Sequence, residues 1–269
     1  MRSLMIRKVL HFWMALLWVS FSLACTEEAH RPAALVSRIK QQYGVSIEKM
    51  IDADQLPRSS VDNIQDKEVE VQFTPPTVAQ FYRCAGIVSK ALKKYPPALV
   101  KKHLNQIWVG GQYRENGGII AGMYEKDKLF LFYNHKKGDN SDLFLEQTLH
   151  HEFSSLLIKF YNFPAFHWLK LNPADFDYII NPSGIKAYMN AVKSYNASEA
   201  QLNQGLVSGY GKANAENDIN SYVELIFTKP ETMKTYIRKY SRIASKYQMI
   251  KRFYLSVSPE FSGVFSLVK

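Results

Sequence analysis

The segment SDLFLEQTLHHEFSSLLIKFY, residues 141–161, is the most informative part of this chain. At about 100° per residue, its large apolar side chains fall on one stripe, which predicts a helix with that stripe buried. A second stripe, roughly opposite, is apolar or small and includes His151, so we expect this histidine not to face solvent. The first stripe contains Leu145, Leu149, Phe153, Leu156 and Phe160, and the second contains Phe144, Thr148, His151, Ser155 and Ile158.

Segments of different periodicity surround this helix. Before it, alternation of apolar and polar residues predicts short strands, and the helical period returns after it. This order predicts an α+β fold in which a small mixed sheet precedes the helix and the C-terminal half is helical. We expect one domain, at residues 67–269. The expected strands are 69–73, 106–113, 119–124 and 129–133, and the other expected helices are 32–43, 77–95, 98–104, 184–194, 214–227 and 230–254.

The helix carries a motif with recognisable chemistry. In the pattern H-E-x-x-H, two histidines one turn apart bind Zn²⁺ and the glutamate activates a zinc-bound water. This chain reads His151-Glu152-Phe153-Ser154-Ser155, so the first histidine and the glutamate are present. Ser155 stands where the second histidine would be, and a neutral hydroxyl is a poor zinc ligand. The motif therefore predicts a reduced zinc site.

The strands followed by a helix with H-E-F resemble the layout of zincin metallopeptidases. The likeness is greatest to bacterial zinc-binding metallopeptidase lipoproteins of the gluzincin branch, which also includes lethal-factor-like domains. In that family a later helix supplies the third ligand from a stretch similar to E-D-F-A-E. Here the later helix reads NAENDINSYVELIF, residues 214–227, and follows VSGYG at 207–211. The resemblance spans about residues 97–240 and implies a zincin-like fold, a zinc cofactor and a peptide or protein substrate.

The resemblance also implies roles for individual residues. His151 corresponds to the first zinc ligand and Glu152 to the catalytic base. The third ligand aligns best with Asn217, and a shift of one residue would place Asp218 or Glu216 there instead. The implied metal set is therefore His151 with an acid from Glu216 or Asp218. Further candidates for the site are Ser155, Asn217, His150 and Glu224.

Other residues offer alternative ligand sets. Glu146 and His150 are four residues apart on the same helix and would form half a site, although such a pair is more often a surface hydrogen bond. His167, in the irregular segment that follows the helix, is a third alternative. Trp168 and Tyr178 in that segment are candidates for the wall of a substrate cleft.

The N-terminus has the composition of an export signal. Arg2, Arg7 and Lys8 precede an apolar run from Val9 to Ala24. That run is short for a membrane-spanning helix, which needs roughly 20 apolar residues. We expect residues 1–24 to be a signal peptide and residues 25–66 to be a tether and leader.

Cys25 follows this run directly and resembles the lipidated cysteine of bacterial lipoproteins, although Ser22 stands where that family prefers leucine. Small residues at Ser22 and Ala24 fit ordinary cleavage as well. We expect lipidation at Cys25, membrane contact through that anchor and a place in the cell envelope, at the outer membrane or in the periplasm. Simple secretion is the alternative. Cys84 is the one other cysteine, so no disulfide framework is expected.

The formal net charge is +10, with lysine and arginine dispersed along the chain. No nucleic-acid-binding motif accompanies them, and export argues against a nucleic-acid partner. An anionic envelope surface or ordinary solvated helix faces explain this charge.

Three functional hypotheses follow. The first is an exported zinc metallopeptidase, a hydrolase in which Glu152 is the base for a zinc-activated water. The second is a catalytically inactive pseudopeptidase that keeps the fold as a binding module in the envelope, and it is motivated by Ser155 and Asn217. The third is an unrelated structural lipoprotein in which His151 and Glu152 are incidental.

Overall fold

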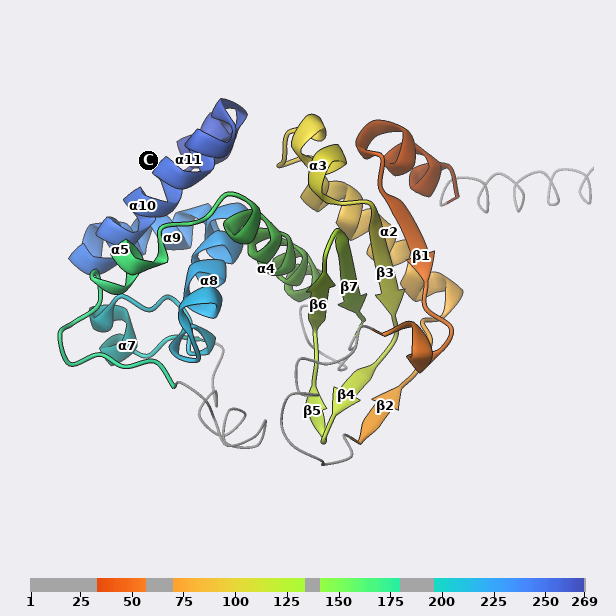
Figure 1. The fold of residues 1–269 in the computed structure, drawn as a ribbon, viewed down its shortest axis with the longest axis horizontal. Coiled ribbons are helices and arrows are strands. Elements are labelled where there is room, and N and C mark those ends of the chain that lie inside the picture. Colours follow the sequence, from red (N-terminus) through yellow and green to blue (C-terminus); the bar gives the residue numbers. More distant parts are fainter. Residues whose placement is uncertain (1–32, 57–69, 134–140, 180–195, 269) are drawn as a thin grey trace, which may run out of the picture.

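The computed structural model describes residues 33–56, 70–133, 141–179 and 196–268. Figure 1 shows the strands and the helices that precede α4 (Ser141–Phe160) on one side of the molecule, the later helices on the other, and α4 between them. A mixed sheet precedes this helix in the sequence, and the C-terminal half is helical. The expected α+β architecture is therefore confirmed.

The main sheet has the strand order β1-β3-β7-β6. These strands are β1 (Ser46–Lys49), β3 (Gln106–Gly110), β7 (Lys128–Phe132) and β6 (Gly122–Glu125). The first three are parallel and β6 runs antiparallel to β7, as its edge strand. Ile107, Val109, Leu129 and Leu131 are fully buried on the face that meets the helices, as alternation predicts.

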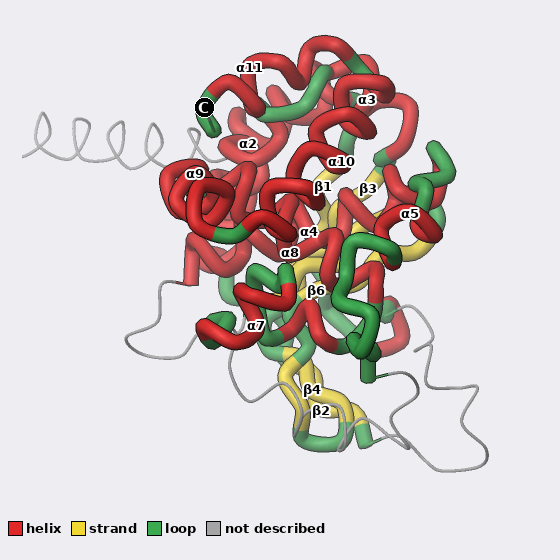
Figure 2. Tube along the Cα trace, turned by 90° about the vertical axis from the view of Figure 1, so that its left-hand side faces the viewer, coloured by secondary structure: helices red, strands yellow, loops and turns green. Residues whose placement is uncertain are grey.

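A second, smaller sheet contains β2 (Val71–Phe73), β4 (Tyr113–Glu115) and β5 (Gly118–Ile119), all antiparallel. The single strand expected at 106–113 is divided here between the two sheets. At the division, a Cβ on Gly111 would lie 2.6 Å from the Thr74 carbonyl oxygen, so only glycine permits this backbone approach. Figure 2 shows β2 and β4 projecting from the helical body of the molecule.

Helices α2 (Val78–Leu92) and α3 (Pro97–His103) pack on the main sheet and form part of its core. Thr77 and Gln80 cap the start of α2 reciprocally, so two of its free N–H groups are satisfied. Cys84 is buried on α2.

Helix α4 is buried over more of its circumference than the two predicted stripes. Leu145, Leu149, Phe153 and Leu156 form the expected core stripe, and His151 is buried as expected. Glu146, Gln147, His150 and Ser154, which belong to neither stripe, are buried as well. Phe160 was expected in the core but is exposed, because the helix ends at this residue.

The C-terminal half contains six helices in the described residues: α5 (Ala165–Leu169), α7 (Glu199–Gln204), α8 (Ala215–Thr228), α9 (Pro230–Lys239), α10 (Ser241–Val257) and α11 (Ser262–Ser266). The prediction of a single helix over 230–254 is wrong, because the helix is interrupted at Tyr240, between α9 and α10. This residue has extended backbone angles, is buried, and donates its hydroxyl to Glu199 at 2.7 Å. Neither proline nor glycine marks this break, so tertiary contacts determine it.

The N-terminal segment contributes to the core. Residues 33–43 are helical, and β1 extends the main sheet from within the stretch predicted to be a leader. Tyr43, Val45 and Ile47 are buried in the main core. The predicted signal peptide at 1–24, Cys25 and the helix expected at 184–194 lie outside the described residues.

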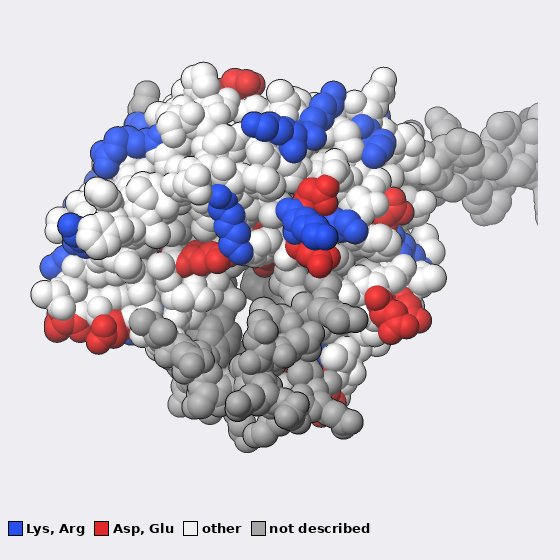
Figure 3. Space-filling model, in the orientation of Figure 1, with Lys and Arg blue, Asp and Glu red and all other residues white. Residues whose placement is uncertain are grey.

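The surface of the described residues carries mixed charge. On the face drawn in Figure 3, lysine and arginine side chains are interspersed with aspartate and glutamate. This agrees with the dispersed basic residues of the sequence. Within the described ranges, none of the helices combines the length and apolar character needed to cross a bilayer.

Candidate functional site

The candidate site lies where α4 meets both α8 and strand β6. A Cβ added to Gly122 of β6 would come within 2.4 Å of Thr148 Cγ2 and 3.1 Å of Glu152 Cγ, so the strand backbone lies directly against the helix. Adjacent helical residues point about 100° apart. Glu152 therefore lies on the side of β6, whereas His151 reaches α8.

His151 bridges two residues of α8. Its Nδ1 lies 2.6 Å from Glu224 Oε1, and its Nε2 lies 3.2 Å from Asn217 Oδ1. Both partner atoms are acceptors, so an imidazole that satisfies both donates from both nitrogens and is positively charged. Burial lowers the pKa of His151, but the Glu224 hydrogen bond and the charge of Glu152 outweigh this effect and raise it to about 9. His151 is therefore an imidazolium at neutral pH.

Glu152 is also buried, with 9% of the residue exposed, and has no hydrogen-bonding partner in the described ranges. Burial raises the pKa of Glu152 to about 7 against the opposing effect of the His151 cation, with a further contribution from Glu216. A carboxyl group with this pKa exchanges a proton readily near neutral pH, which is what a general base requires.

Ser155, which stands at the position of the missing second histidine, forms a hydrogen bond with another neutral side chain. Asn220 Nδ2 donates to Ser155 Oγ at 2.7 Å, and both side chains are buried. On the same side of α8, Ser221 Oγ donates to the Asn217 carbonyl at 2.7 Å and lies 2.6 Å from Ser208 Oγ. Neutral side chains therefore occupy the position of the second histidine, at Ser155, and the position that aligns best with the third ligand, at Asn217.

Glu216, one of the two acids predicted as alternative third ligands, lies at the site. Its Oε1 accepts a hydrogen bond from the Tyr124 hydroxyl of β6 at 2.8 Å. Lys159 of α4 donates to the same hydroxyl and lies over the Tyr124 ring. The strand, α4 and α8 are thus joined at this carboxylate.

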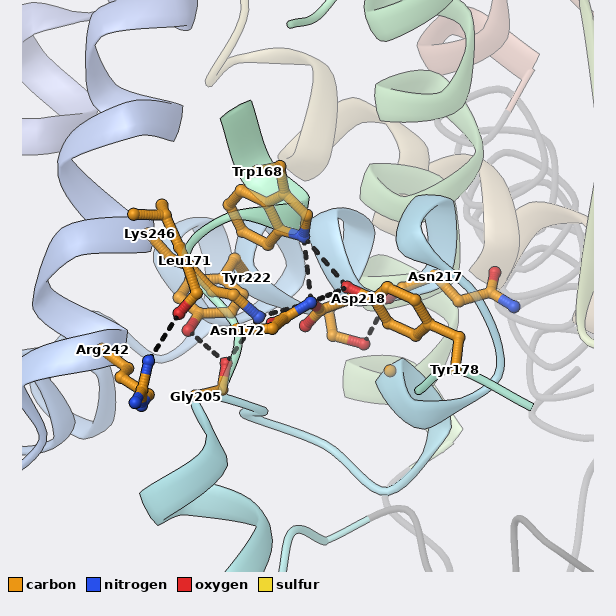
Figure 4. Close-up of polar contacts among 12 residues, drawn as sticks. Trp168, Leu171, Asn172, Tyr178, Gly205, Asn217, Asp218, Tyr222, Arg242 and Lys246 are labelled. Atoms are coloured by element: carbon orange, nitrogen blue, oxygen red, sulfur yellow. Dashed lines mark hydrogen bonds and ion pairs between the residues drawn. The ribbon is translucent and has the colours of Figure 1, made fainter. Parts of the chain in front are cut away.

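Asp218, the other predicted acid, is directed away from His151. It is fully buried and pairs with Lys246 Nζ of α10 at 2.6 Å. Trp168 and Tyr178, which were expected to line a cleft, instead donate to Asp218 Oδ2 at 3.0 Å and 2.6 Å. Figure 4 shows Asn217 pointing away from this cluster of side chains. Asp218 is therefore part of the core rather than of a metal site with His151.

The alternative pair Glu146 and His150 is buried, not on the surface as expected. Glu146 accepts from Lys90 at 2.7 Å and from Lys94 at 2.5 Å, so lysines neutralise its charge. His150 Nδ1 lies 2.8 Å from the Tyr95 hydroxyl, and its Nε2 lies 3.9 Å from Glu146. Because its carboxylate is already paired with two cations, Glu146 is not free to bind a metal ion.

The residues of the site do not fit a zinc ion. Structural and catalytic zinc sites use three or four nitrogen, sulfur or carboxylate ligands. Within the described ranges, no three His, Cys, Asp or Glu side chains are grouped so as to hold a metal. His151 has both ring nitrogens engaged, Ser155 and Asn217 are neutral, and His167 is exposed on α5.

Three residues were not singled out from the sequence: two that contact the site and one that pairs with Asp218 in the core. Tyr124 lies in a strand that was predicted, and Lys159 lies in the predicted helix. Lys246 falls at the same helical spacing as the buried residues Ile243 and Ile250, and this position on the apolar face was a readable signal of burial.

Comparisons with known proteins bear on the fold. No family model matches this chain, and no curated protein matches it. A solved structure from Bacteroides caccae, described as a "putative zinc-binding metallo-peptidase", matches with a TM-score of 0.51 over 88% of this chain and 91% of its own. The two sequences are 13% identical. This chain therefore shares its fold with a protein that is described as a zinc-binding metallopeptidase.

Proposed function

We propose that this chain is a metallopeptidase-fold protein that binds extended peptide segments and does not hydrolyse them with zinc. The observation that supports the proposal is the engagement of His151, whose two ring nitrogens are both bonded to residues of α8. The protonated imidazole links Glu224 and Asn217 in the place where a metallopeptidase would hold its cation. This is the pseudopeptidase hypothesis.

The edge of the main sheet offers the peptide-binding surface. Among the described strands, β6 pairs with β7 alone, so its other edge is available. An extended peptide adds to such an edge through main-chain hydrogen bonds. Gly122 and Tyr124 belong to β6, and they contact Glu152 and Glu216 respectively. A peptide on β6 would therefore pass along the candidate site.

A zinc metallopeptidase remains the competing function, because one observation favours it. Glu152 is unpartnered in the described residues, and its pKa of about 7 suits a catalytic base. An unrelated structural lipoprotein does not explain the likeness in fold to the Bacteroides protein.

The place of action is part of the proposal. The basic start and apolar run of residues 1–24 support export, and Cys25 supports a lipid anchor in the cell envelope. Binding would then occur outside the cytoplasm, with secretion of the unlipidated chain as the alternative.

Zinc content and peptide cleavage test the proposal together. The purified protein is incubated with zinc, freed of excess metal and analysed by mass spectrometry, and cleavage of a fluorogenic peptide mixture is followed. We expect well under one zinc per chain and no cleavage. The matched variant Ser155→His restores the second histidine, and we expect it to retain more zinc, because a neutral imidazole replaces a hydroxyl.

One result would establish the competing function. If the wild-type protein holds one zinc per chain, His151→Ala loses it, and Glu152→Gln abolishes peptide cleavage, the protein is a zinc metallopeptidase. The isosteric glutamine keeps the size of Glu152, so a loss of activity in that variant reports on the carboxylate and not on folding.

A further inference from the structure

Two carboxylates at the proposed peptide site have no cation within hydrogen-bonding distance in the described residues. Glu216 is bonded to the Tyr124 hydroxyl, and Lys159 donates to that hydroxyl rather than to the acid. Glu152 has neither a hydrogen bond nor an ion pair. The His151 cation interacts electrostatically with both acids but is hydrogen-bonded to Glu224 at 2.6 Å, so in the described residues neither acid has a cation bonded to it.

The burial of Glu152 makes this arrangement informative. Burying a carboxylate without a partner is costly, so such groups are normally paired or bind a ligand. Glu152 is nine-tenths buried, yet its oxygens are not among the fully enclosed unpartnered atoms of the described residues. A ligand group can therefore reach this carboxylate.

The two acids come from different elements that meet at the same strand. Glu152 lies on α4 against the backbone of Gly122, and Glu216 lies on α8 against Tyr124. Both contacts are to residues of β6 that lie two positions apart, so both side chains lie against the strand to which a peptide would add. Side chains two residues apart on a strand lie on the same side of the sheet.

We propose that Glu152 and Glu216 together bind a positively charged group of the peptide, either an amino terminus or the side chain of lysine or arginine. This inference rests on the proposed peptide binding at β6. An ammonium group carries three donors and no acceptor, so it suits two carboxylates whose remaining acceptors are unused. Unlike zinc, it requires no nitrogen ligand from His151.

A peptide library tests this specificity. Positional-scanning libraries of eight-residue peptides, one N-acetylated and one with free amino termini, are selected on the immobilised protein. Affinities of the selected peptides are then measured by fluorescence anisotropy. We expect enrichment of lysine or arginine at one position of the acetylated library, or of the free amino terminus in the other, and acetylation of that amine should abolish the preference. The two libraries thereby distinguish the two sources of positive charge.

Isosteric variants show whether the two acids carry the preference. We expect Glu152→Gln and Glu216→Gln each to weaken binding of the selected peptide by at least about tenfold, or ~1.4 kcal/mol. Glu231→Gln is the matched control, because Glu231 is an exposed acid on α9 and is not part of the proposed peptide site. It removes the same charge and should change affinity little.

The outcomes separate this inference from the function on which it rests. If peptides bind but neutral or acidic residues are selected at every position, peptide binding stands and the cation site is refuted. The cation site is also refuted if Glu231→Gln weakens binding as much as Glu152→Gln does. If neither library yields a binding peptide, both the peptide-binding function and the cation site are wrong.

Discussion

Replacing Lys246 with methionine should destabilise this protein severely. Lys246 and Asp218 are both fully buried, with their charged atoms 2.6 Å apart. Lys246 Nζ also donates to the Gly205 carbonyl and lies 4.8 Å from the centre of the Trp168 ring. Burial lowers the pKa of Lys246 and raises that of Asp218, and their mutual attraction opposes both shifts. The attraction between the two charges thus offsets the free-energy cost of burying each of them.

The expected loss of stability depends on which charge remains buried without a partner in the variant. Lys246→Met keeps the packing volume but leaves the Asp218 carboxylate buried without its cation. Breaking a buried pair in this way costs about 3–5 kcal/mol. At about 2–4 °C per kcal/mol, the melting temperature should fall by roughly 6–20 °C.

The double variant Asp218→Asn with Lys246→Met should recover much of this loss. It removes both charges, and the asparagine oxygen still accepts from Trp168 and Tyr178, which bond to Asp218 Oδ2 at 3.0 Å and 2.6 Å. Replacing a whole buried pair is often close to neutral. The double variant is therefore expected to be more stable than Lys246→Met alone.

Urea unfolding followed by circular dichroism measures the free energies for a double-mutant cycle. Arg252→Met is the matched control, since Arg252 is exposed on the same helix, and such surface changes usually stay within about 0.5 kcal/mol. The reasoning is refuted if Lys246→Met costs no more than Arg252→Met. It is also refuted if the two single losses simply add in the double variant, because a coupled pair requires non-additivity.

Three further predictions concern pH and glycine. The pKa of His151 is raised to about 9 and that of Glu152 to about 7, so both groups contribute stability that is lost as pH rises. The free energy of unfolding should therefore fall between about pH 4.5 and 7 through Glu152 and between about pH 6.5 and 9 through His151. His151→Gln should flatten the upper part of the profile, and an unchanged slope there would contradict the assignment. Gly122→Ala should cost about 1–3 kcal/mol in urea unfolding, because its Cβ would lie 2.4 Å from Thr148 Cγ2, and Thr148→Ser should relieve part of the cost. Gly86→Ala, in the middle of α2 with no atom within 4 Å of the new Cβ, should instead stabilise by about 0.5–1 kcal/mol, and a loss of stability would show that this helix position is not free.

Local sequence pattern predicted which residues of two helices lie close to His151, but not the whole candidate site. The apolar stripes of residues 141–161 predicted a helix, burial of His151 and its adjacency to Glu152. The Asn217 and Glu224 positions share one face of α8 because they are seven residues apart, two helical turns. Both contact His151 in the structure. The helical period therefore determined which side chains of α8 accompany His151.

Partners from distant segments were beyond the reach of such patterns. Asp218 was a reasonable third ligand by spacing, but Lys246, 28 residues later, holds its carboxylate on the other side of α8. Tyr124 reaches Glu216 across 92 residues of sequence. Periodicity places a residue on a face of its own element, whereas the group that meets that face depends on how the elements pack.

In the described residues, some features follow from the local sequence and others only from tertiary contacts. The sequence by itself determined the fold class, most strands and helices, and the loss of the second histidine, because these follow from local periodicity and residue identity. The tertiary structure alone decided the break at Tyr240, the switch of sheets at Gly111 and the pairing of β1 with β3. Each of these depends on contacts with residues far away in the chain, and the free energy of those contacts outweighs local preference.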